Sequence, residues 1–391
     1  METKYIKELM KVPIKNWATD IEDGALIQAT NLSNLPFIFH HVALMPDCHQ
    51  GYGMPIGGVI ATKGYIVPNA VGVDIGCGMC ATKTDIRIDD LSTDTLKQIM
   101  GEIRKQIPVG FEHHKTKCDN NDMPDLPRDD LFIVSQEYES ARTQLGTLGG
   151  GNHFIEIQKG SDGYVWIMIH SGSRNIGLKV ADYYNKAAEE QNERWFSEVK
   201  KDKELAFFPI NSMLGVRYLE EMEYCLKFAY LNRLKMMTTI EHIFKSIYPN
   251  ISFPQFINIH HNYASIEEHF GEEVVIHRKG ATSAKRGEVG IIPGSQGTCS
   301  YIVEGLGNPE SYQSCSHGAG RKMGRKEAQR NLNLEDEKKK LDDKGILHAI
   351  RNKDDLDEAS GAYKDIDIVM ENQKDLVKIL VKLEPLGVIK G

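Results

Sequence analysis

The chain has 391 residues, of which 41% are hydrophobic and 26% charged, and its formal net charge is −8. This composition is that of an ordinary globular protein, and the acidic balance argues against a protein that binds nucleic acid through one broad basic face. No apolar run approaches the roughly 20 residues that cross a bilayer, and residues 1–20 lack the apolar core of a signal peptide. We therefore expect a cytoplasmic protein without a membrane-spanning segment.

Several predicted elements stand out along the chain. Four strand-like apolar runs lead into Gly, Asn or His, at residues 154–158, 164–170, 255–261 and 273–277. Apolar residues at helical spacing predict a long helix over residues 212–248, with its Leu and Met stripe packed in the core. Residues 333–345 mix both charge signs and predict a solvated helix. Without internal repeats or a long linker, we expect one mixed α+β domain over residues 1–391, with central β-sheets flanked by helices.

The seven cysteines are scattered and odd in number, so a disulfide framework is not expected. Cys77 and Cys80 form a C-x-x-C pair, which in other proteins can be a redox motif at the start of a helix. Here both flanks are Gly-rich, and no second C-x-x-C completes a structural zinc site. The sequence therefore argues against a role for the two cysteines as a pair.

Histidines carry the clearest functional signal. His153, His170, His261 and His317 all lie where a strand-like run meets Gly or Asn. A single such histidine is more often a satisfied core or surface residue, but strand ends hold ligands and imidazole is the commonest metal ligand among side chains. Four histidines in the same setting indicate a site.

A carboxylate and a thiol extend this set. Asp74 and Cys77 are three residues apart on a Gly-rich loop. Aspartate, thiolate and imidazole together suit zinc or manganese in a catalytic site. If one thiolate bridged two ions, a separation of about 3.5–4 Å would suit phosphoryl transfer.

Three Gly-rich loops accompany the metal-binding residue types, at residues 145–153, 291–300 and 316–321. Such loops expose backbone N–H groups that can hold phosphate oxygens, although none matches the P-loop pattern. Glycines also simply form turns, so each loop alone is a weak signal. Their interleaving with candidate ligands favours phosphoryl or nucleotidyl transfer.

Taken together, the motifs resemble the RtcB family of RNA-splicing ligases. The matching segments run in order through "MPDCHQGYGMPIGGVIAT", "AVGVDIGCG", "LGGGNHFIE", "IHSGSR", "HHNYA", "RKGA", "IIPGSQG", "SCSHGAGR" and the terminal "VIKG". The resemblance implies an RtcB-like single domain with an active-site cleft at strand ends. It also implies a manganese- and GTP-dependent enzyme, with two Mn²⁺ ions, that joins an RNA 3′-phosphate or 2′,3′-cyclic phosphate to a 5′-hydroxyl. Its substrates would be tRNA halves or cleaved RNA.

The resemblance also implies roles for individual residues. His317 would be the catalytic nucleophile that carries GMP, a role that suits a neutral imidazole. The implied metal ligands are Asp74, Cys77, His153, His170 and His261. The implied guanylate contacts are Asn152, His153, Phe154, Ile155, Glu156, His261, Asn262, Pro293, Gly294, Ser295, Gln296, Ser300, His317, Gly318, Ala319, Gly320 and Lys390. Lys390 can take part only if the C-terminal tail folds back.

For several other residues, the sequence leaves more than one role open. Arg174 and Arg321 are expected to contact phosphate or RNA, because a guanidinium binds phosphate in a bidentate manner. Asp47 and His49 would either orient or deprotonate a terminal hydroxyl or form a structural pair, and Tyr363 would either stack on guanine or be an ordinary core or surface residue. An archease-type activator is a possible partner, and a monomer is expected. The competing functions are a metal-dependent 2′,3′-cyclic phosphodiesterase and a non-ligating protein that binds RNA ends.

Overall fold

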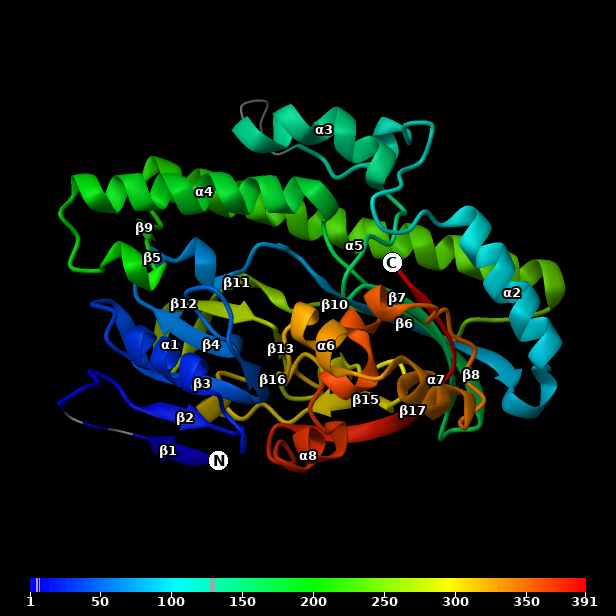
Figure 1. The fold of residues 1–391 in the computed structure, drawn as a ribbon. Coiled ribbons are helices and arrows are strands. Elements are labelled where there is room, and N and C mark those ends of the chain that lie inside the picture. The colour runs from blue at the N-terminus through cyan, green and yellow to red at the C-terminus, as the bar shows by residue number, and fades with distance from the viewer. Residues whose placement is uncertain (5, 7, 127–130) are drawn as a thin grey trace.

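Two large β-sheets and a layer of long helices make up the fold (Figure 1). The structure is a computed structural model and describes residues 1–4, 6, 8–126 and 131–391. Strands and helices both contribute extensively, so the predicted mixed α+β class is confirmed. Among the described residues, no helix combines the length and the apolar composition needed to cross a bilayer.

The first sheet has six strands in the order β1-β2-β3-β4-β12-β11. Their bounds are Glu2–Lys4 for β1, Ile14–Asn16 for β2, Ile38–His49 for β3, Ile56–Thr62 for β4, Glu272–Lys279 for β12 and Asn262–His269 for β11. Only β2 and β3 run parallel. The predicted strand at residues 273–277 is confirmed as part of β12.

The second sheet has seven strands in the order β10-β6-β8-β7-β17-β15-β14, all paired antiparallel. Their bounds are Gln255–His260 for β10, Gly78–Arg87 for β6, Tyr164–Ser171 for β8, Phe154–Gly160 for β7, Val377–Lys390 for β17, Ser300–Gly305 for β15 and Val289–Ile292 for β14. The remaining three predicted strands are thus confirmed as β7, β8 and β10. The last strand of the chain, β17, lies inside the sheet.

Two further sheets consist of only two strands each. One pairs β13 (Ala281–Ser283) with β16 (Ser314–Ser316), and the other pairs β5 (Tyr65–Ile66) with β9 (Phe208–Pro209). β13 follows β12 after a single glycine, so it continues from the six-stranded sheet.

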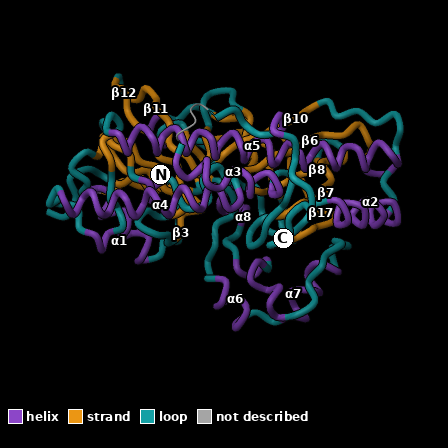
Figure 2. The backbone as a smooth tube through the Cα atoms, turned by 90° about the horizontal axis from the view of Figure 1, so that it is seen from above, coloured by secondary structure: helices purple, strands orange, loops and turns teal. Residues whose placement is uncertain are grey.

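Helices α3, α4 and α5 form a layer on one side of the sheets, in which α5 extends over both sheets (Figure 1). The helices are α1 (Asp23–Ser33), α2 (Thr93–Gln106), α3 (Phe132–Gln144), α4 (Arg174–Arg194), α5 (Met213–Ile247), α6 (Arg325–Asn331), α7 (Leu334–Asp342) and α8 (Ile366–Glu371). Helices α6 and α7 project to one side of the sheets (Figure 2).

The long predicted helix is α5, which has 35 residues and is therefore about 50 Å long. Ser212 caps its N-terminus, where the side-chain oxygen accepts a hydrogen bond from the Gly215 N–H. Met222, Met237 and Phe244 of the predicted stripe are buried. The helix contacts α2, α3 and α4 as well as strands β6, β8 and β10, which makes it the element that ties the helical layer to the seven-stranded sheet.

The predicted charged helix is α7, capped by the Asn333 side chain. Most of its side chains are at least partly exposed, as expected, but Glu337 and Leu341 are buried. All seven cysteines are free, which agrees with the absence of a disulfide framework in the sequence prediction.

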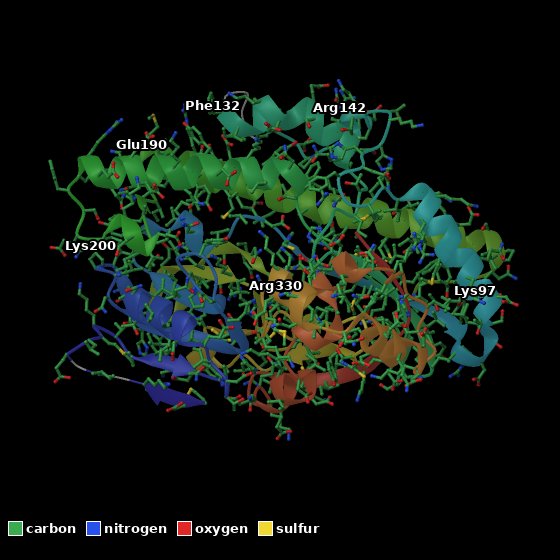
Figure 3. All side chains as sticks on the ribbon, in the orientation of Figure 1. Lys97, Phe132, Arg142, Glu190, Lys200 and Arg330 are labelled. Carbon is green, nitrogen blue, oxygen red and sulfur yellow. The ribbon has the colours of Figure 1, made fainter. Side chains whose placement is uncertain are left out.

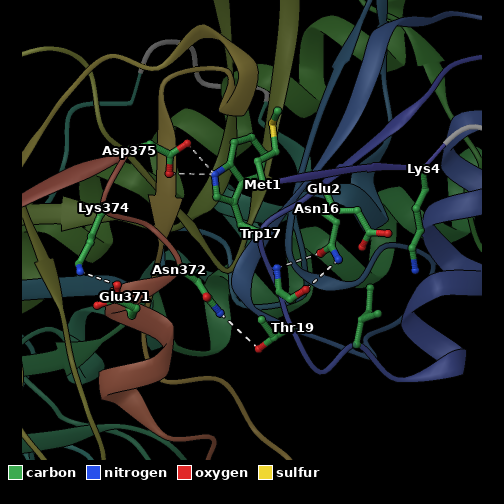
Figure 4. Close-up of a pocket in the computed structure, with 12 residues that line it drawn as sticks. Met1, Glu2, Lys4, Asn16, Trp17, Thr19, Glu371, Asn372, Lys374 and Asp375 are labelled. Atoms are coloured by element: carbon green, nitrogen blue, oxygen red, sulfur yellow. Dashed lines mark hydrogen bonds and ion pairs between the residues drawn. The ribbon is translucent and has the colours of Figure 1, made fainter.

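A pocket of about 660 Å³ opens between β1, the residues that follow β2 and the turn after α8 (Figure 4). Trp17 forms part of its wall, and its indole N–H donates to the Asp375 carboxylate. None of the described residues that line this pocket is a histidine or a cysteine, so it is separate from the predicted metal ligands.

Candidate metal and nucleophile site

The candidate site lies where the chain passes from one large sheet to the other. His261 stands between β10 of the seven-stranded sheet and β11 of the six-stranded sheet. Cys77 immediately precedes β6, His153 immediately precedes β7, and His170 lies near the end of β8. Because β10, β6, β8 and β7 are neighbours, their ends bring these side chains together.

Cys77 is the centre of the cluster. Its Sγ lies 3.3 Å from Nε2 of His170 and 3.5 Å from Nε2 of His153. His153 Nε2 lies 3.2 Å from Oδ2 of Asp74, and His170 Nε2 lies 3.4 Å from Nε2 of His261. The donor atoms form two groups, Asp74–Cys77–His153 and Cys77–His170–His261, each with all donors within 4.8 Å of one another. Cys77 belongs to both groups.

Backbone carbonyls orient two of the imidazoles. Nδ1 of His153 donates to the Leu148 carbonyl at 2.9 Å, and Nδ1 of His170 donates to the Asn152 carbonyl at 3.0 Å. A proton fixed on Nδ1 leaves the Nε2 lone pair facing Cys77, which is the usual arrangement of a metal-binding histidine. Nδ1 of His261 is buried without a hydrogen-bond partner among the described residues.

The protonation preferences of these groups fit a bound cation. Burial, reinforced by the charge of Asp74, raises the pKa of the Cys77 thiol well above its usual range. Burial, with the charges of neighbouring histidines, holds the pKa values of His170 and His261 well below the usual range. Burial thus favours the neutral form of His170 and His261 that a metal ligand needs, and a cation would stabilise the Cys77 thiolate that burial and Asp74 oppose. The residue set thus fits divalent metal ions.

Cys80 takes no part in this cluster. It lies within β6 and is fully buried, with its Sγ 3.9 Å from the Arg233 carbonyl oxygen. Burial raises the pKa of its thiol to about 12. The two cysteines of the C-x-x-C motif therefore have separate environments, in agreement with the sequence interpretation.

His317 follows β16 and faces the metal-binding set through His261, with the two ring centres 4.8 Å apart. On its other side, Nδ1 lies 2.7 Å from Oδ2 of Asp47. The same carboxylate oxygen accepts from the backbone N–H groups of His317 and Gly318. Asp47 is completely buried; burial alone would raise its pKa, but the charge and hydrogen bond of His317 outweigh this effect and lower it. A buried carboxylate therefore holds His317 by both its ring and its backbone.

This arrangement excludes one form of the predicted pairing between Asp47 and His49, while their action on a terminal hydroxyl stays a prediction. The His49 ring contacts the Asp47 backbone carbonyl at 2.9 Å, not the carboxylate. The partner of the Asp47 carboxylate is His317, so the two residues do not form an Asp–His side-chain pair. Burial lowers the pKa of His49 to about 4.

Glycine at position 320 is required by the backbone of Asp47. Gly320 has a φ of +75°, and a Cβ there would lie 2.3 Å from the Asp47 carbonyl oxygen. At Gly318, in contrast, a Cβ would come no closer than 3.4 Å to the Pro293 carbonyl oxygen. Gly320 thus serves the close contact between the His317 loop and β3, whereas a Cβ at Gly318 would make only an ordinary van der Waals contact with Pro293.

Five of the candidate guanylate residues lie on three adjacent strands: Phe154, Ile155 and Glu156 on β7, Lys390 on β17 and Ser300 on β15. The others lie at strand ends or in the loops after β14 and β16. The C-terminal tail does fold back, because Lys390 of β17 pairs with Phe154 of β7 and its Nζ lies 5.8 Å from the Phe154 ring centre. Burial lowers the pKa of Lys390, while the carboxylates of Glu358, Asp357 and Glu156 oppose that shift. A partly desolvated cation therefore faces this end of the sheet.

Glu156 and Ser300 meet through Gln158. The Gln158 amide donates to Glu156 at 2.6 Å and to Ser300 Oγ at 3.3 Å, and Ser300 Oγ accepts from the Gly294 N–H. Burial raises the pKa of Glu156 to about 8, despite the opposing hydrogen bond from Gln158 and the charge of Lys390. This network links β7 to the loop that begins at Pro293.

Glu358 is a hub that the sequence analysis missed. Its carboxylate accepts from Arg321 Nη1 at 2.8 Å, from Arg325 Nε at 2.7 Å and from the Tyr363 hydroxyl. Its backbone carbonyl accepts from the Gln296 side chain at 2.9 Å. Glu358 therefore connects the loop after His317 to the loop after β14. It lies in a charged stretch that reads as solvated surface, so no local pattern reveals this role.

Arg321 and Tyr363 both belong to this hub. The Arg321 guanidinium also donates to the carbonyls of Met323 and Asp357, and it lies 5.1 Å from the Tyr363 ring centre. The contact of Arg321 with phosphate or RNA stays a prediction, since all three of its nitrogens already donate within the protein.

Arg174 and Asn262 lie beside the metal-binding set. Arg174 Nη1 is 3.5 Å from Nδ1 of His153, and its Nε donates to Thr147. The Asn262 side chain donates to the Asp74 carbonyl and accepts from the Gly280 N–H. Asn262 therefore braces the loop that carries Asp74 against the end of β12.

Comparisons with known proteins show the family of this chain. The family model described as "tRNA-splicing ligase RtcB" matches residues 28–131 and 125–391. The RNA-splicing ligase RtcB of Escherichia coli (strain K12) is 39% identical over 408 residues, covering 97% of each chain. The tRNA-splicing ligases RtcB of Thermococcus kodakarensis and Nanoarchaeum equitans are 32% and 31% identical, over 98% and 99% of this chain and 95% and 98% of theirs. The chain belongs to the RtcB family.

Proposed function

We propose that this chain is an RNA ligase that joins a 3′-phosphate or 2′,3′-cyclic phosphate end to a 5′-hydroxyl end, with GTP as co-substrate and two Mn²⁺ ions as cofactors. The observation that carries the proposal is the placement of His317 between the buried Asp47 carboxylate and the Cys77-centred set. The names of the relatives, which are RNA- and tRNA-splicing ligases, support the same activity.

The geometry favours His317 as a nucleophile. With its Nδ1 proton donated to Asp47, the ring keeps a lone pair on Nε2. Attack of Nε2 on the α-phosphorus of GTP forms an N–P bond and expels pyrophosphate. The imidazolium that develops is stabilised by the Asp47 carboxylate, as in other acid–histidine pairs. Asp47 therefore orients the ring and compensates its charge.

Two cations would be held by Asp74, Cys77, His153, His170 and His261, with Cys77 shared between the Asp74–Cys77–His153 and Cys77–His170–His261 groups. When bound, they would supply positive charge to the phosphate oxygens during transfer. The protein's own part is to fix His153 and His170 through the Leu148 and Asn152 carbonyls. It also buries Cys77 and the three histidines away from bulk water, while Asp74 stays partly exposed.

Two further transfers would complete the reaction. An oxygen of the RNA 3′-phosphate attacks the phosphorus of the His317–GMP adduct, which breaks the N–P bond and returns the lone pair to Nε2. The 5′-hydroxyl of the second strand then attacks the activated 3′-phosphate, loses its proton and displaces GMP. A cyclic end is first opened by water to a 3′-phosphate.

The guanylate would lie along the ends of β7, β17 and β15, against residues 152–156, 261–262, 293–296, Ser300, 317–320 and Lys390. The network of Gln158 and Glu358 supports this assignment, because it joins these loops into one wall. We further propose that residues 1–391 act as one catalytic domain, in the cytoplasm and as a monomer. The RNA would come from tRNA splicing or repair, with an archease-type protein as a possible activator.

A labelling experiment tests the mechanism. The protein is incubated with Mn²⁺ and α-labelled GTP, denatured, and examined for covalent label that is acid-labile, as expected of a phosphoramidate. His317→Ala should lose the label, whereas His242→Ala, a change at an exposed position on α5, should keep it. Absence of label in the metal-loaded wild-type protein would overturn the ligase mechanism. Opening of a cyclic phosphate without GTP and without joined product would support the phosphodiesterase instead.

A further inference from the structure

Phe111 is fully exposed on a loop that is otherwise firmly held. Its side chain has an exposed fraction of 102%, the highest among the large apolar residues of the described chain. The Gly110 N–H donates to the Gly149 carbonyl at 2.8 Å, and the Leu148 N–H donates to the Pro108 carbonyl at 2.9 Å. The His114 N–H donates to the Thr143 carbonyl on the other side of Phe111. A fixed backbone thus presents an aromatic ring to solvent.

This loop lies directly beside the candidate site. Gly149 and Gly150 belong to the Gly-rich loop that leads into His153, and a Cβ at Gly150 would lie 3.6 Å from the Gly110 Cα. The Arg174 side chain contacts both the Phe111 loop and the candidate site. Its Nη2 lies 3.5 Å from the Gly110 carbonyl oxygen, and its Nη1 lies 3.5 Å from His153 Nδ1. Phe111 is therefore separated from a candidate metal ligand by one glycine and one arginine side chain.

We propose that Phe111 stacks on a nucleobase of the RNA strand whose end lies at the metal-binding set. This inference rests on the proposed RNA ligase activity and adds a binding site for the strand next to the reacting phosphate. Single-stranded RNA ends are recognised by aromatic rings that stack on unpaired bases, together with cations that neutralise the phosphates.

The chemistry of the loop favours a nucleobase over an apolar protein partner. Phe111 is one ring and not a patch, and Lys115 and Lys117 follow it within six residues, although Glu112 lies next to it and Lys117 forms an ion pair with Glu139. A stacked base needs one flat apolar surface with positive charge nearby, whereas a protein interface needs a wider apolar surface. The acidic chain thus places an aromatic ring and local cations together beside the site.

Three substitutions at Phe111 separate the possible contributions of its ring. Phe111→Ala removes the ring, Phe111→Leu keeps an apolar side chain without a flat face, and Phe111→Trp keeps a stacking surface. Phe196→Ala is the matched control, because Phe196 has an exposed fraction of 93% and follows the C-terminal end of α4. Arg174, which contacts the Phe111 loop, is the first residue of α4. The 21 residues of this helix therefore place Phe196 about 30 Å from Arg174. Glu190 and Lys200, which bracket Phe196, lie far from Arg142 at the end of α3 (Figure 3).

Binding is measured in the absence of GTP, so that no ligation occurs, with short RNAs that carry 2-aminopurine near either a 3′-phosphate or a 5′-hydroxyl end. Loss of one stacked base should weaken binding of one of the two ends about tenfold in Phe111→Ala and Phe111→Leu. Quenching of the 2-aminopurine fluorescence should be lost in Phe111→Ala and Phe111→Leu and retained in Phe111→Trp. The RNA whose binding weakens shows whether Phe111 stacks near the 3′-phosphate or near the 5′-hydroxyl end. The proposal would be overturned if Phe111→Ala bound both kinds of RNA end with affinities within twofold of those of Phe196→Ala. It would also be overturned if Phe111→Leu bound both RNAs as tightly as the wild-type protein does.

Labelling of His317 by GTP without RNA separates this proposal from the proposed function. The Phe111 variants should label as fast as the wild-type protein, because stacking concerns RNA alone, and a slower reaction in Phe111→Ala would overturn a role restricted to RNA. If the wild-type protein did not label, the ligase mechanism would fall, while the binding measurements would still decide the role of Phe111.

Discussion

Oδ2 of Asp47 lies 2.7 Å from Nδ1 of His317, although the two residues are 270 positions apart in the chain. Asp47 comes from β3 of the six-stranded sheet, and His317 follows the short strand β16. The same oxygen binds two backbone N–H groups of the His317 loop, so the carboxylate fixes both the position and the tautomer of the ring. The candidate nucleophile is thus defined by two distant segments.

The first prediction concerns the tautomer of His317. In Asp47→Asn, the amide can donate a hydrogen bond to Nδ1, which moves the ring proton to Nε2 and removes the lone pair needed for attack. We expect the rate of GMP transfer to His317 to fall by about 10²- to 10⁴-fold, the range seen when the carboxylate of an acid–histidine pair is lost. The measurement is the single-turnover rate of covalent labelling. Metal content should stay unchanged, and an unaltered labelling rate would contradict the role of Asp47.

The second prediction compares the two cysteines of the C-x-x-C motif. Cys77→Ala should lose most of the bound Mn²⁺, at least about tenfold in affinity, because this thiolate belongs to both donor groups. Cys80→Ala is the matched control, since its Sγ faces the Arg233 carbonyl and not the histidines. Metal bound per chain is counted after reconstitution and gel filtration. Equal losses in the two variants would favour a site built on the cysteine pair.

The third prediction concerns the Glu358 hub. Burial raises the pKa of Glu358, but the charges of Lys390, Arg321 and Arg325 outweigh this effect and lower it. Glu358→Gln removes the charge that these cations share, so we expect the free energy of unfolding to fall by about 2–3 kcal/mol. Urea unfolding measures the change.

The neighbouring residue supplies the control for that experiment. Asp357 accepts from Arg321 through its backbone carbonyl, so Asp357→Asn retains this bond and should unfold almost as the wild-type protein does. A loss of stability in Asp357→Asn as large as that in Glu358→Gln would show that the loss does not come from the Glu358 carboxylate.

The fourth prediction concerns acid stability through Glu267 and Arg278. Arg278 is fully buried, forms an ion pair with Glu267 and donates to Ser314 on β16. Burial raises the pKa of Glu267, but the His269 hydrogen bond and the Arg278 charge outweigh burial and hold it far below the usual range. The unfolded chain therefore binds the proton more tightly, and the stabilisation present at neutral pH is lost as pH falls below about 4.

Substitutions on β11 check this dependence. Glu267→Gln should flatten the decline of unfolding free energy between neutral and acidic pH, whereas Glu268→Gln, at the exposed next position, should leave the profile unchanged. Arg278→Met should cost about 3–5 kcal/mol at neutral pH, because it leaves a buried carboxylate without its partner. Equal pH profiles for Glu267→Gln and the wild-type protein would refute the assignment.

Local sequence patterns predicted helices and strands well where the apolar residues of a segment follow a single helical or strand-like spacing. The stripe from Leu219 to Phe244 predicted α5, and the apolar runs predicted β7, β8, β10 and β12, because each pattern reflects one buried face. The grouping of the candidate metal ligands was predictable for a related reason, since Cys77, His153, His170 and His261 lie at or next to strand ends and Asp74 shares a Gly-rich loop with Cys77.

Contacts between distant segments lie beyond such patterns. The partner of Asp47 could not be read from "PDCH", because the nearest histidine in the sequence, His49, contacts only the backbone of Asp47. Glu358 resembled a solvated charge until the fold placed Arg321, Arg325 and Tyr363 around it. In both cases the pairing depends on strand order, which one local stretch of sequence does not encode.

The position of β17 has a consequence for how the protein is made. Residues 377–390 are synthesised after β7 and β15, yet β17 lies between these two strands and pairs with both. Neither strand has its final neighbour until residue 390 has left the ribosome, so the seven-stranded sheet stays open until then. Lys390 belongs to the same strand, and the candidate guanylate residues therefore come together only at that stage. A truncated product would retain the Cys77-centred set but would leave two strand edges open in the middle of the sheet.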